Sequence, residues 1–151
     1  DVAVGAPFYA EGMADRGIVW PIFLDDDGTY KDVARFDGFG SDFDGDLDGG
    51  DLFGEGLAGI GDLDGDGVPD LAVGAPGDDD GDSLNQGAVW VLFMDRDGLV
   101  DGYQKISADE GGFCAGESFQ DFFRVRMPRA ACAFFQIVFE IGIALRGEPP
   151  R

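Results

Sequence analysis

The feature that most constrains the fold of this chain is an internal repeat of about 70 residues. The segment DVAVGAP at 1–7 recurs as DLAVGAP at 70–76, an offset of 69, and GIVW at 17–20 recurs as GAVW at 87–90, an offset of 70. A further match follows in the same order: the pair Asp27-Gly28 recurs at 97–98, again an offset of 70. Self-similarity of this kind predicts copies of one structural unit that stack on each other.

The repeated unit is built from short segments that favour β-structure. The segments LAVGA (71–75), AVWVLFM (88–94) and GYQKIS (102–107) are rich in valine, aromatic and β-branched residues. An Asp-Gly pair after the apolar run is a strong hairpin signal. Adding LAGIGDL (57–63) makes four strands per unit, which is typical of a propeller blade. We therefore expect an all-β fold, a partial β-propeller of four-stranded antiparallel blades.

The repeat ends after Phe113, where the charge also changes. Residues 1–113 hold 27 acidic and 5 basic residues, whereas 114–151 hold 4 and 5 and contain both cysteines. We expect 1–50 to be the end of one blade with an acidic connecting loop, and 51–113 to be a second blade. Three interpretations of the discordant tail, 114–151, remain open: a frameshifted end of the reading frame, a divergent segment, or a membrane-proximal piece. The absence of an initial Met and of a targeting signal indicates a fragment of a longer protein.

The residues with the clearest chemistry lie in GDLDGDGVPD, 61–70. Four aspartates occupy positions 1, 3, 5 and 9 of a tight loop, and Gly67 at position 6 supplies the sharp turn. Their oxygens, with one backbone carbonyl at position 7, suit Ca²⁺ better than Mg²⁺ or zinc. The predicted calcium ligands are the side chains of Asp62, Asp64, Asp66 and Asp70 and the carbonyl of Val68.

Other interpretations of the acidic segments are also possible. The loop at 62–70 is not an EF-hand, because its twelfth position is Val73 rather than Glu; the remaining alternative is a solvated acidic turn. Residues 42–48 alternate in a similar way, but Leu47 and Gly50 occupy positions 6 and 9, so a solvated loop is preferred there over a second ion in 42–51. We expect a hairpin turn at 25–27 and a surface loop at 78–82.

Several apolar residues are assigned to packing. Trp20 and Trp90 occupy matching positions and are expected to pack between blades, with ligand stacking as the alternative. Phe53 is expected in the core, while Gly5, Gly54 and Gly74 are expected at turns or where strands approach closely.

The motifs together resemble a known family. Asp51-Leu52-Phe53-Gly54, the aspartate loop and Gly74-Ala75-Pro76 resemble an FG-GAP repeat, the blade of integrin α-subunit propellers, also found in secreted and surface proteins of bacteria. The resemblance covers 1–113. It implies that Asp62, Asp64, Asp66, Asp70 and Val68 bind calcium, and that Asp1, which aligns with Asp70, is the last ligand of another such loop.

Composition limits the function. A net charge of −21 disfavours nucleic acid and anionic membranes, and the absence of histidine removes the commonest general base. The apolar stretch 130–145 is short for a membrane span, so no membrane insertion is predicted. We expect a non-catalytic calcium-binding module of an extracellular or cell-surface protein. Its partners would be neighbouring blades and, through propeller loops, a protein or glycan ligand for adhesion. A structural spacer and an accessory domain of a polysaccharide-acting enzyme are the alternatives.

Overall fold

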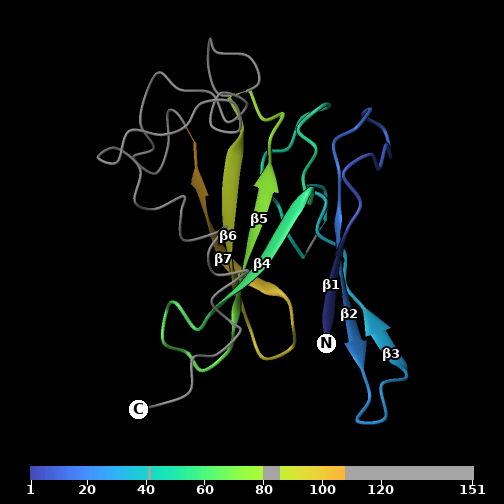
Figure 1. The fold of residues 1–151 in the computed structure, drawn as a ribbon, viewed down its shortest axis with the longest axis vertical. Coiled ribbons are helices and arrows are strands. Elements are labelled where there is room, and N and C mark those ends of the chain that lie inside the picture. Colours follow the sequence, from blue (N-terminus) through green and yellow to red (C-terminus); the bar gives the residue numbers. More distant parts are fainter. Residues whose placement is uncertain (41, 80–85, 108–151) are drawn as a thin grey trace, which may run out of the picture.

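The computed structural model describes residues 1–40, 42–79 and 86–107, which form two antiparallel β-sheets (Figure 1). The first sheet has the strand order β1-β2-β3 and the second the order β4-β5-β6-β7. The predicted all-β fold, a partial β-propeller, is therefore confirmed for this part of the chain. The strands are β1 (Val2–Gly5), β2 (Val19–Leu24), β3 (Tyr30–Val33), β4 (Gly56–Gly61), β5 (Asp70–Ala75), β6 (Ala88–Met94) and β7 (Val100–Ile106).

The sequence repeat is also a repeat of backbone hydrogen bonds. In the β2–β3 turn the Asp25 N–H donates to the Thr29 carbonyl at 2.9 Å, and in the β6–β7 turn the Asp95 N–H donates to the Leu99 carbonyl at the same distance. The two turns are 70 residues apart, so β1, β2 and β3 correspond to β5, β6 and β7. The predicted hairpin turn at 25–27 is confirmed.

The strand boundaries differ slightly from those expected. The strand predicted at 57–63 ends at Gly61, which has a φ of 76° that stops the extended backbone. The strand predicted at 102–107 begins two residues earlier, at Val100. The division of the chain at residues 50 and 113 stays a prediction, and the tail 114–151 lies outside the described residues. Within the described ranges no helix is long and apolar enough to cross a membrane.

The main core lies between the two sheets. Val73 and Trp90 are directly opposite each other on β5 and β6, so their side chains share one face, and both are almost completely buried. They belong to the same cluster as Val19 and Phe36 from the first sheet and its connection to the second. Burial of these large apolar side chains is the main favourable contribution to holding the sheets together.

The acidic segment 42–48 is not simply the solvated loop that the sequence favoured. Its apolar members point inward: Phe43 is 2% exposed and Leu47 is 5% exposed, while Asp44 and Asp46 face solvent. The Phe43 ring stacks on Phe53 with centroids 5.3 Å apart and meets the edge of Trp90 at 5.5 Å. The segment therefore fills the space between the sheets. Phe53 is confirmed as a core residue, with no exposed surface.

Two glycines allow the sheets to approach closely, as expected. A Cβ on Gly5 would lie 1.9 Å from the Gly54 carbonyl oxygen, which no side chain tolerates. The neighbouring backbone joins both sheets, because the Phe53 N–H donates to the Arg16 carbonyl at 2.9 Å and the Gly54 N–H donates to the Gly74 carbonyl at 3.0 Å. The Phe-Gly pair is thus one of the points at which the two units are connected.

Two further expectations need correction. Trp90 packs between the sheets as predicted, but Trp20 is only half-buried and meets the Tyr9 ring edge-on at 6.1 Å. Trp20 is directly opposite Val4 on β1, so the two side chains share one face of the first sheet. Val4 is exposed, and this face therefore points away from the second sheet. Asp78, expected in a surface loop, is 2% exposed and forms an ion pair with Lys105 at 2.8 Å. Residues 80–82 of that loop lie outside the described residues.

Candidate calcium site

The aspartate loop connects β4 to β5 at one end of the second sheet (Figure 1). Gly65 and Gly67 have φ values of 86° and 93°, conformations that are strained for residues with a side chain. The Asp62 carboxylate accepts hydrogen bonds from both of their N–H groups, at 2.7 Å for Gly65 and 3.0 Å for Gly67. The loop therefore bends around the first aspartate of the motif.

Three of the four predicted aspartates converge. Asp62, Asp64 and Asp70 each offer a carboxylate oxygen, and these oxygens all lie within 4.8 Å of one another. Asp62 and Asp64 are exposed, whereas Asp70 is 1% exposed. Three carboxylates at this spacing repel one another, and a cation among them would remove that repulsion. Their all-oxygen chemistry fits a hard cation such as Ca²⁺.

Asp70 is held rigidly because it begins β5. Its Oδ2 accepts a hydrogen bond from the Leu63 N–H at 2.7 Å, which closes the loop. Its Oδ1 accepts one from the Met94 N–H at 3.1 Å, which fixes the carboxylate to the end of β6. Asp70 is therefore the fixed member of the group, and the exposed aspartates are carried by the loop.

Asp66 and Val68 are placed differently from the other predicted ligands. Asp66 lies outside the group of three carboxylates, and its Oδ1 accepts a hydrogen bond from the Val68 N–H at 2.7 Å. The Asp66 N–H in turn donates to the Asp64 carboxylate at 3.1 Å. In this arrangement both residues shape the loop. Their roles as calcium ligands stay predictions.

A buried acidic pair that the sequence did not reveal lies at the junction of the units. Asp51 is 3% exposed, and burial, with a smaller contribution from the nearby charge of Asp78, raises its pKa to about 6. Its Oδ2 accepts a hydrogen bond from the Asp48 N–H at 2.7 Å. Asp78 is paired with Lys105. No local pattern distinguishes these acids from exposed ones, since burial here depends on the contact between sheets.

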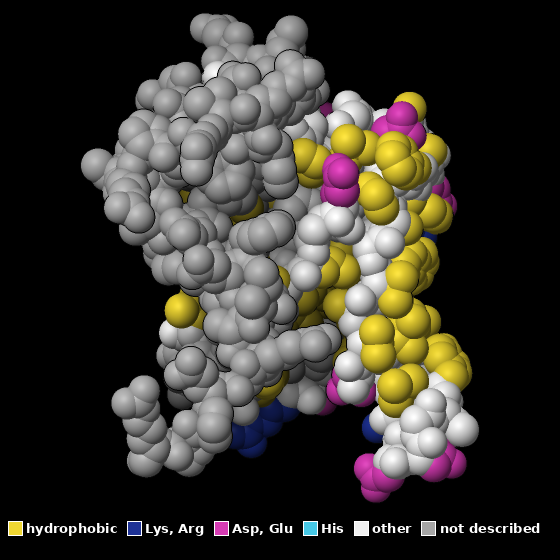
Figure 2. Space-filling view, in the orientation of Figure 1, with side chains coloured by type: hydrophobic (Ala, Val, Ile, Leu, Met, Phe, Trp, Pro, Cys, Tyr) yellow, Lys and Arg dark blue, Asp and Glu magenta, His cyan; other side chains and the backbone are white. Residues whose placement is uncertain are grey.

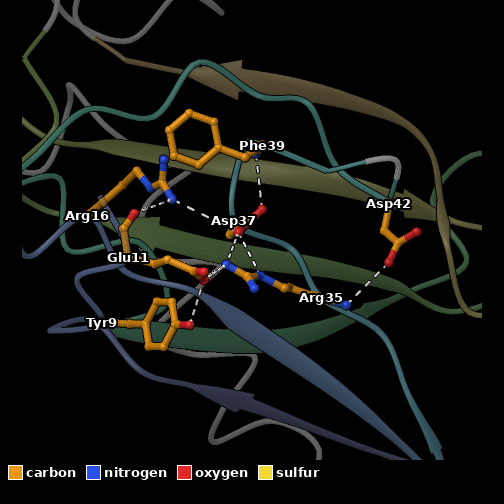
Figure 3. A network of polar contacts seen from close by, with 7 residues as sticks. All are labelled: Tyr9, Glu11, Arg16, Arg35, Asp37, Phe39 and Asp42. Carbon is orange, nitrogen blue, oxygen red and sulfur yellow. Dashed lines mark hydrogen bonds and ion pairs between the residues drawn. The ribbon is translucent and has the colours of Figure 1, made fainter. Parts of the chain in front are cut away.

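A second polar cluster, drawn in Figure 3, lies in the segments that follow β1 and β3, at the opposite end of the strands from the aspartate loop (Figure 1). Arg35 forms ion pairs with Glu11 and, at 2.6 Å, with Asp37. Hydrogen bonds from Tyr9 and Arg35 hold the pKa of Glu11 below its usual value, while the bond to Glu11 raises the pKa of Tyr9. Burial lowers the pKa of the Arg16 guanidinium, which stacks on the Phe39 ring at 3.6 Å. Each cation has an acid beside it, so this cluster ties together the loops at that end.

The aspartate loop lies within a segment that matches a known family of sequence repeats. A sequence model of the FG-GAP repeat matches residues 53–92, which span β4, the aspartate loop, β5 and most of β6. Residues 53–92 are an FG-GAP repeat. No match was found among curated proteins. The FG-GAP match begins at Phe53, the residue that joins the two sheets, so the Phe-Gly pair named in the motif has a structural role in this chain.

Proposed function

We propose that this chain is a non-catalytic, calcium-binding β-propeller module of an extracellular or cell-surface protein. The observation that carries the proposal is the convergence of the Asp62, Asp64 and Asp70 carboxylates within 4.8 Å in the loop of an FG-GAP repeat. FG-GAP repeats are generally non-catalytic, often bind Ca²⁺ and occur mainly in extracellular or surface proteins.

The loop geometry supports calcium as the cation. The carboxylates supply oxygen ligands only, and calcium accepts six to eight of these in flexible geometry. The exposed side of the group, at Asp62 and Asp64, leaves room for water ligands. Calcium sites in extracellular modules have dissociation constants on the order of 10⁻⁴ to 10⁻³ M, which matches calcium concentrations outside cells.

The loops at the end away from the calcium site are the proposed surface for a protein or glycan ligand. Phe8 and Phe39 project there with 72% and 63% of their surface exposed, in loops tied down by the Glu11–Arg35–Asp37 cluster. Exposed aromatic side chains on fixed loops are typical of adhesive contacts. The strong negative charge of the chain disfavours nucleic acid as the partner.

The proposal is tested by calorimetric titration of the full chain with CaCl₂, with MgCl₂ as the competing ion. We expect one site of millimolar or submillimolar affinity for Ca²⁺ and weaker binding of Mg²⁺. Calcium at ten times its dissociation constant would raise the free energy of unfolding by about 1.4 kcal/mol. Asp64→Asn should weaken binding at least tenfold. Asp26→Asn removes an exposed acid from the β2–β3 turn and serves as the matched control.

Two results would contradict the proposal. One is equal weakening of calcium binding by Asp64→Asn and Asp26→Asn, which would indicate that the ion responds to net charge alone. The other is the absence of any heat or thermal shift at 10 mM Ca²⁺ from a folded chain.

Adhesion is tested separately, by binding of the calcium-loaded chain to cells or matrix. Replacing Phe8 and Phe39 by alanine should abolish it, and chelator should weaken it.

A further inference from the structure

A lysine and an aspartate of the second unit meet in a buried position. The Nζ of Lys105 lies 2.8 Å from the Oδ1 of Asp78, and the two side chains are only 14% and 2% exposed. A buried ion pair contributes little stability, because both charges lose their hydration. Transfer of one proton from the ammonium to the carboxylate removes both charges. It leaves a neutral amine beside a neutral carboxylic acid, the two groups that condense to an amide.

The backbone holds both groups in place. Lys105 is directly opposite Trp90 in the β6–β7 pairing, and its Nζ lies 5.3 Å from the centroid of that buried ring. Asp78 lies between β5 and β6, where its N–H donates to the Ala75 carbonyl at 3.2 Å and its carbonyl accepts from the Gly87 N–H at 3.0 Å. Groups that are fixed in contact and well oriented react as if present at effective concentrations of about 10⁵ M or more.

A second acid, Asp51, lies beside this pair. Its pKa is about 6, mainly because of burial, and the charges of Asp78 and Lys105 also act on it. The Asp51 carbonyl accepts a hydrogen bond from the Gly77 N–H at 3.1 Å, so its segment is tied to that of Asp78. A carboxyl group that titrates near neutral pH both gives and accepts protons readily. Two further charged side chains act on Asp51, those of Asp48 and Arg16.

We propose that Lys105 and Asp78 condense to an intramolecular isopeptide bond, with Asp51 as the proton relay. The neutral amine of Lys105 attacks the Cγ of Asp78 and forms the C–N bond. Asp51, in its protonated form, donates its proton to the departing oxygen of Asp78, so the C–O bond breaks and water leaves. Asp51 then recovers a proton from the new amide nitrogen and ends unchanged. One water molecule is lost, and no group is oxidised or reduced.

The bond ties the outer part of the second sheet together. Strand β7 is the last in the order β4-β5-β6-β7, and the amide attaches it to the segment that precedes β6. A cross-link stabilises a fold mainly by restricting the unfolded chain. It also resists the peeling of β7 from β6, which suits a module that bears load at a surface. The condensation itself does not depend on calcium binding.

The test is the intact mass of the full chain, measured under denaturing conditions after incubation at neutral pH. We expect the chain to be lighter by one water molecule. Chymotrypsin cleaves after Trp90 and Tyr103, which lie between the two bonded residues. A digest fragment that contains Asp78 and Lys105 but lacks residues 91–103 would identify the bond by tandem mass spectrometry.

The scarcity of lysine provides a matched control. The chain has two lysines, Lys105 and the exposed Lys31 of β3, and few Lys or Arg side chains are visible on the face drawn in Figure 2. Lys105→Arg keeps the positive charge and should abolish the mass loss, whereas Lys31→Arg should preserve it. Asp51→Asn keeps an acceptor for the Asp48 N–H and should lower the bonded fraction at a fixed time by about tenfold or more.

Three results would overturn the proposal. An unchanged mass, in a chain whose β7 amides are protected from hydrogen exchange, would show that the ion pair persists without condensing. A mass loss that survives Lys105→Arg would have another origin, such as succinimide formation at Asp-Gly pairs. Equal bonded fractions in the wild-type chain and in Asp51→Asn would exclude Asp51 as the relay. Urea unfolding of both chains, measured alongside, separates a slower reaction from a weakened fold.

Discussion

The carboxylate of Asp70 accepts a hydrogen bond from the backbone N–H of Met94 at 3.1 Å, although the two residues are 24 positions apart. The same relationship links Asp1 to Leu24 in the first sheet. The last aspartate of the acidic loop thus has a structural role that does not depend on a metal ion. It fixes the start of one strand against the end of the next.

Replacing Asp70 by alanine should therefore destabilise the chain even without calcium. The substitution leaves the N–H groups of Leu63 and Met94 without their acceptor, and we expect a loss of about 2–4 kcal/mol in the free energy of unfolding. Urea unfolding in EGTA measures it. Asp64→Ala is the control, because Asp64 is exposed and should change the stability in EGTA by less than about 1 kcal/mol. Equal effects of the two substitutions would contradict this prediction.

Gly5→Ala should force the two sheets apart. The added methyl group would lie 1.9 Å from the Gly54 carbonyl oxygen, which belongs to backbone that cannot easily move. We expect a loss of about 2–3 kcal/mol or more, measured by chemical unfolding. Gly59→Ala in β4 is the matched control, since its Cβ would meet no atom within 4 Å and its stability should be unchanged or slightly higher. A tolerated Gly5→Ala would show that the contact is looser in solution.

The buried carboxyl of Asp51 predicts a characteristic pH dependence. Its pKa is about 6 in the folded chain against 3.8 for an ordinary aspartate, so the folded state holds this proton more tightly than the unfolded state. Ionisation therefore lowers stability progressively as the pH rises from about 4 to about 6, by up to about 3 kcal/mol. The measurement compares unfolding of the wild-type chain and Asp51→Asn at pH 4 and pH 7.5 in EGTA.

In that comparison the Asp51→Asn chain should gain stability relative to the wild type as the pH rises, since the asparagine oxygen still accepts the Asp48 N–H and carries no charge. Groups with lowered pKa values, such as Glu11, contribute the opposite slope in both chains and cancel in the difference. A constant difference between pH 4 and pH 7.5 would show that Asp51 is hydrated or otherwise compensated in solution.

Phe43→Ala should remove much of the core between the sheets. The ring contacts Phe53, Trp90 and Tyr103, with centroid distances of 5.3, 5.5 and 5.3 Å. Truncation of a buried phenylalanine costs about 3–5 kcal/mol. Thermal unfolding, followed by the near-ultraviolet signal of the two tryptophans, measures the loss. Phe8→Ala, at a side chain that is 72% exposed, should have little effect on stability. A comparable loss in both variants would place Phe43 outside the solution core.

Much of the local structure follows from the sequence alone. The Asp-Gly turns and the segments rich in valine, aromatic and β-branched residues predicted the strands, because these signals act between residues close together in the chain. The offsets of 69 and 70 residues predicted that this pattern of strands repeats. The spacing of aspartates and glycine in 62–70 likewise predicted a sharp loop with converging carboxylates, three of which the structure brings together. Short-range geometry is sufficient for such features.

Contacts between distant segments were decided by the tertiary structure. Phe43 and Leu47 are in the core, although their acidic neighbours suggested a solvated loop, because the second sheet covers one side of that segment. Asp51 and Asp78 are buried for the same reason, and Trp20 is half-buried where the matching Trp90 is covered. Burial depends on which surfaces meet, so matching positions of the two repeated units differ in exposure according to the neighbour that packs against them.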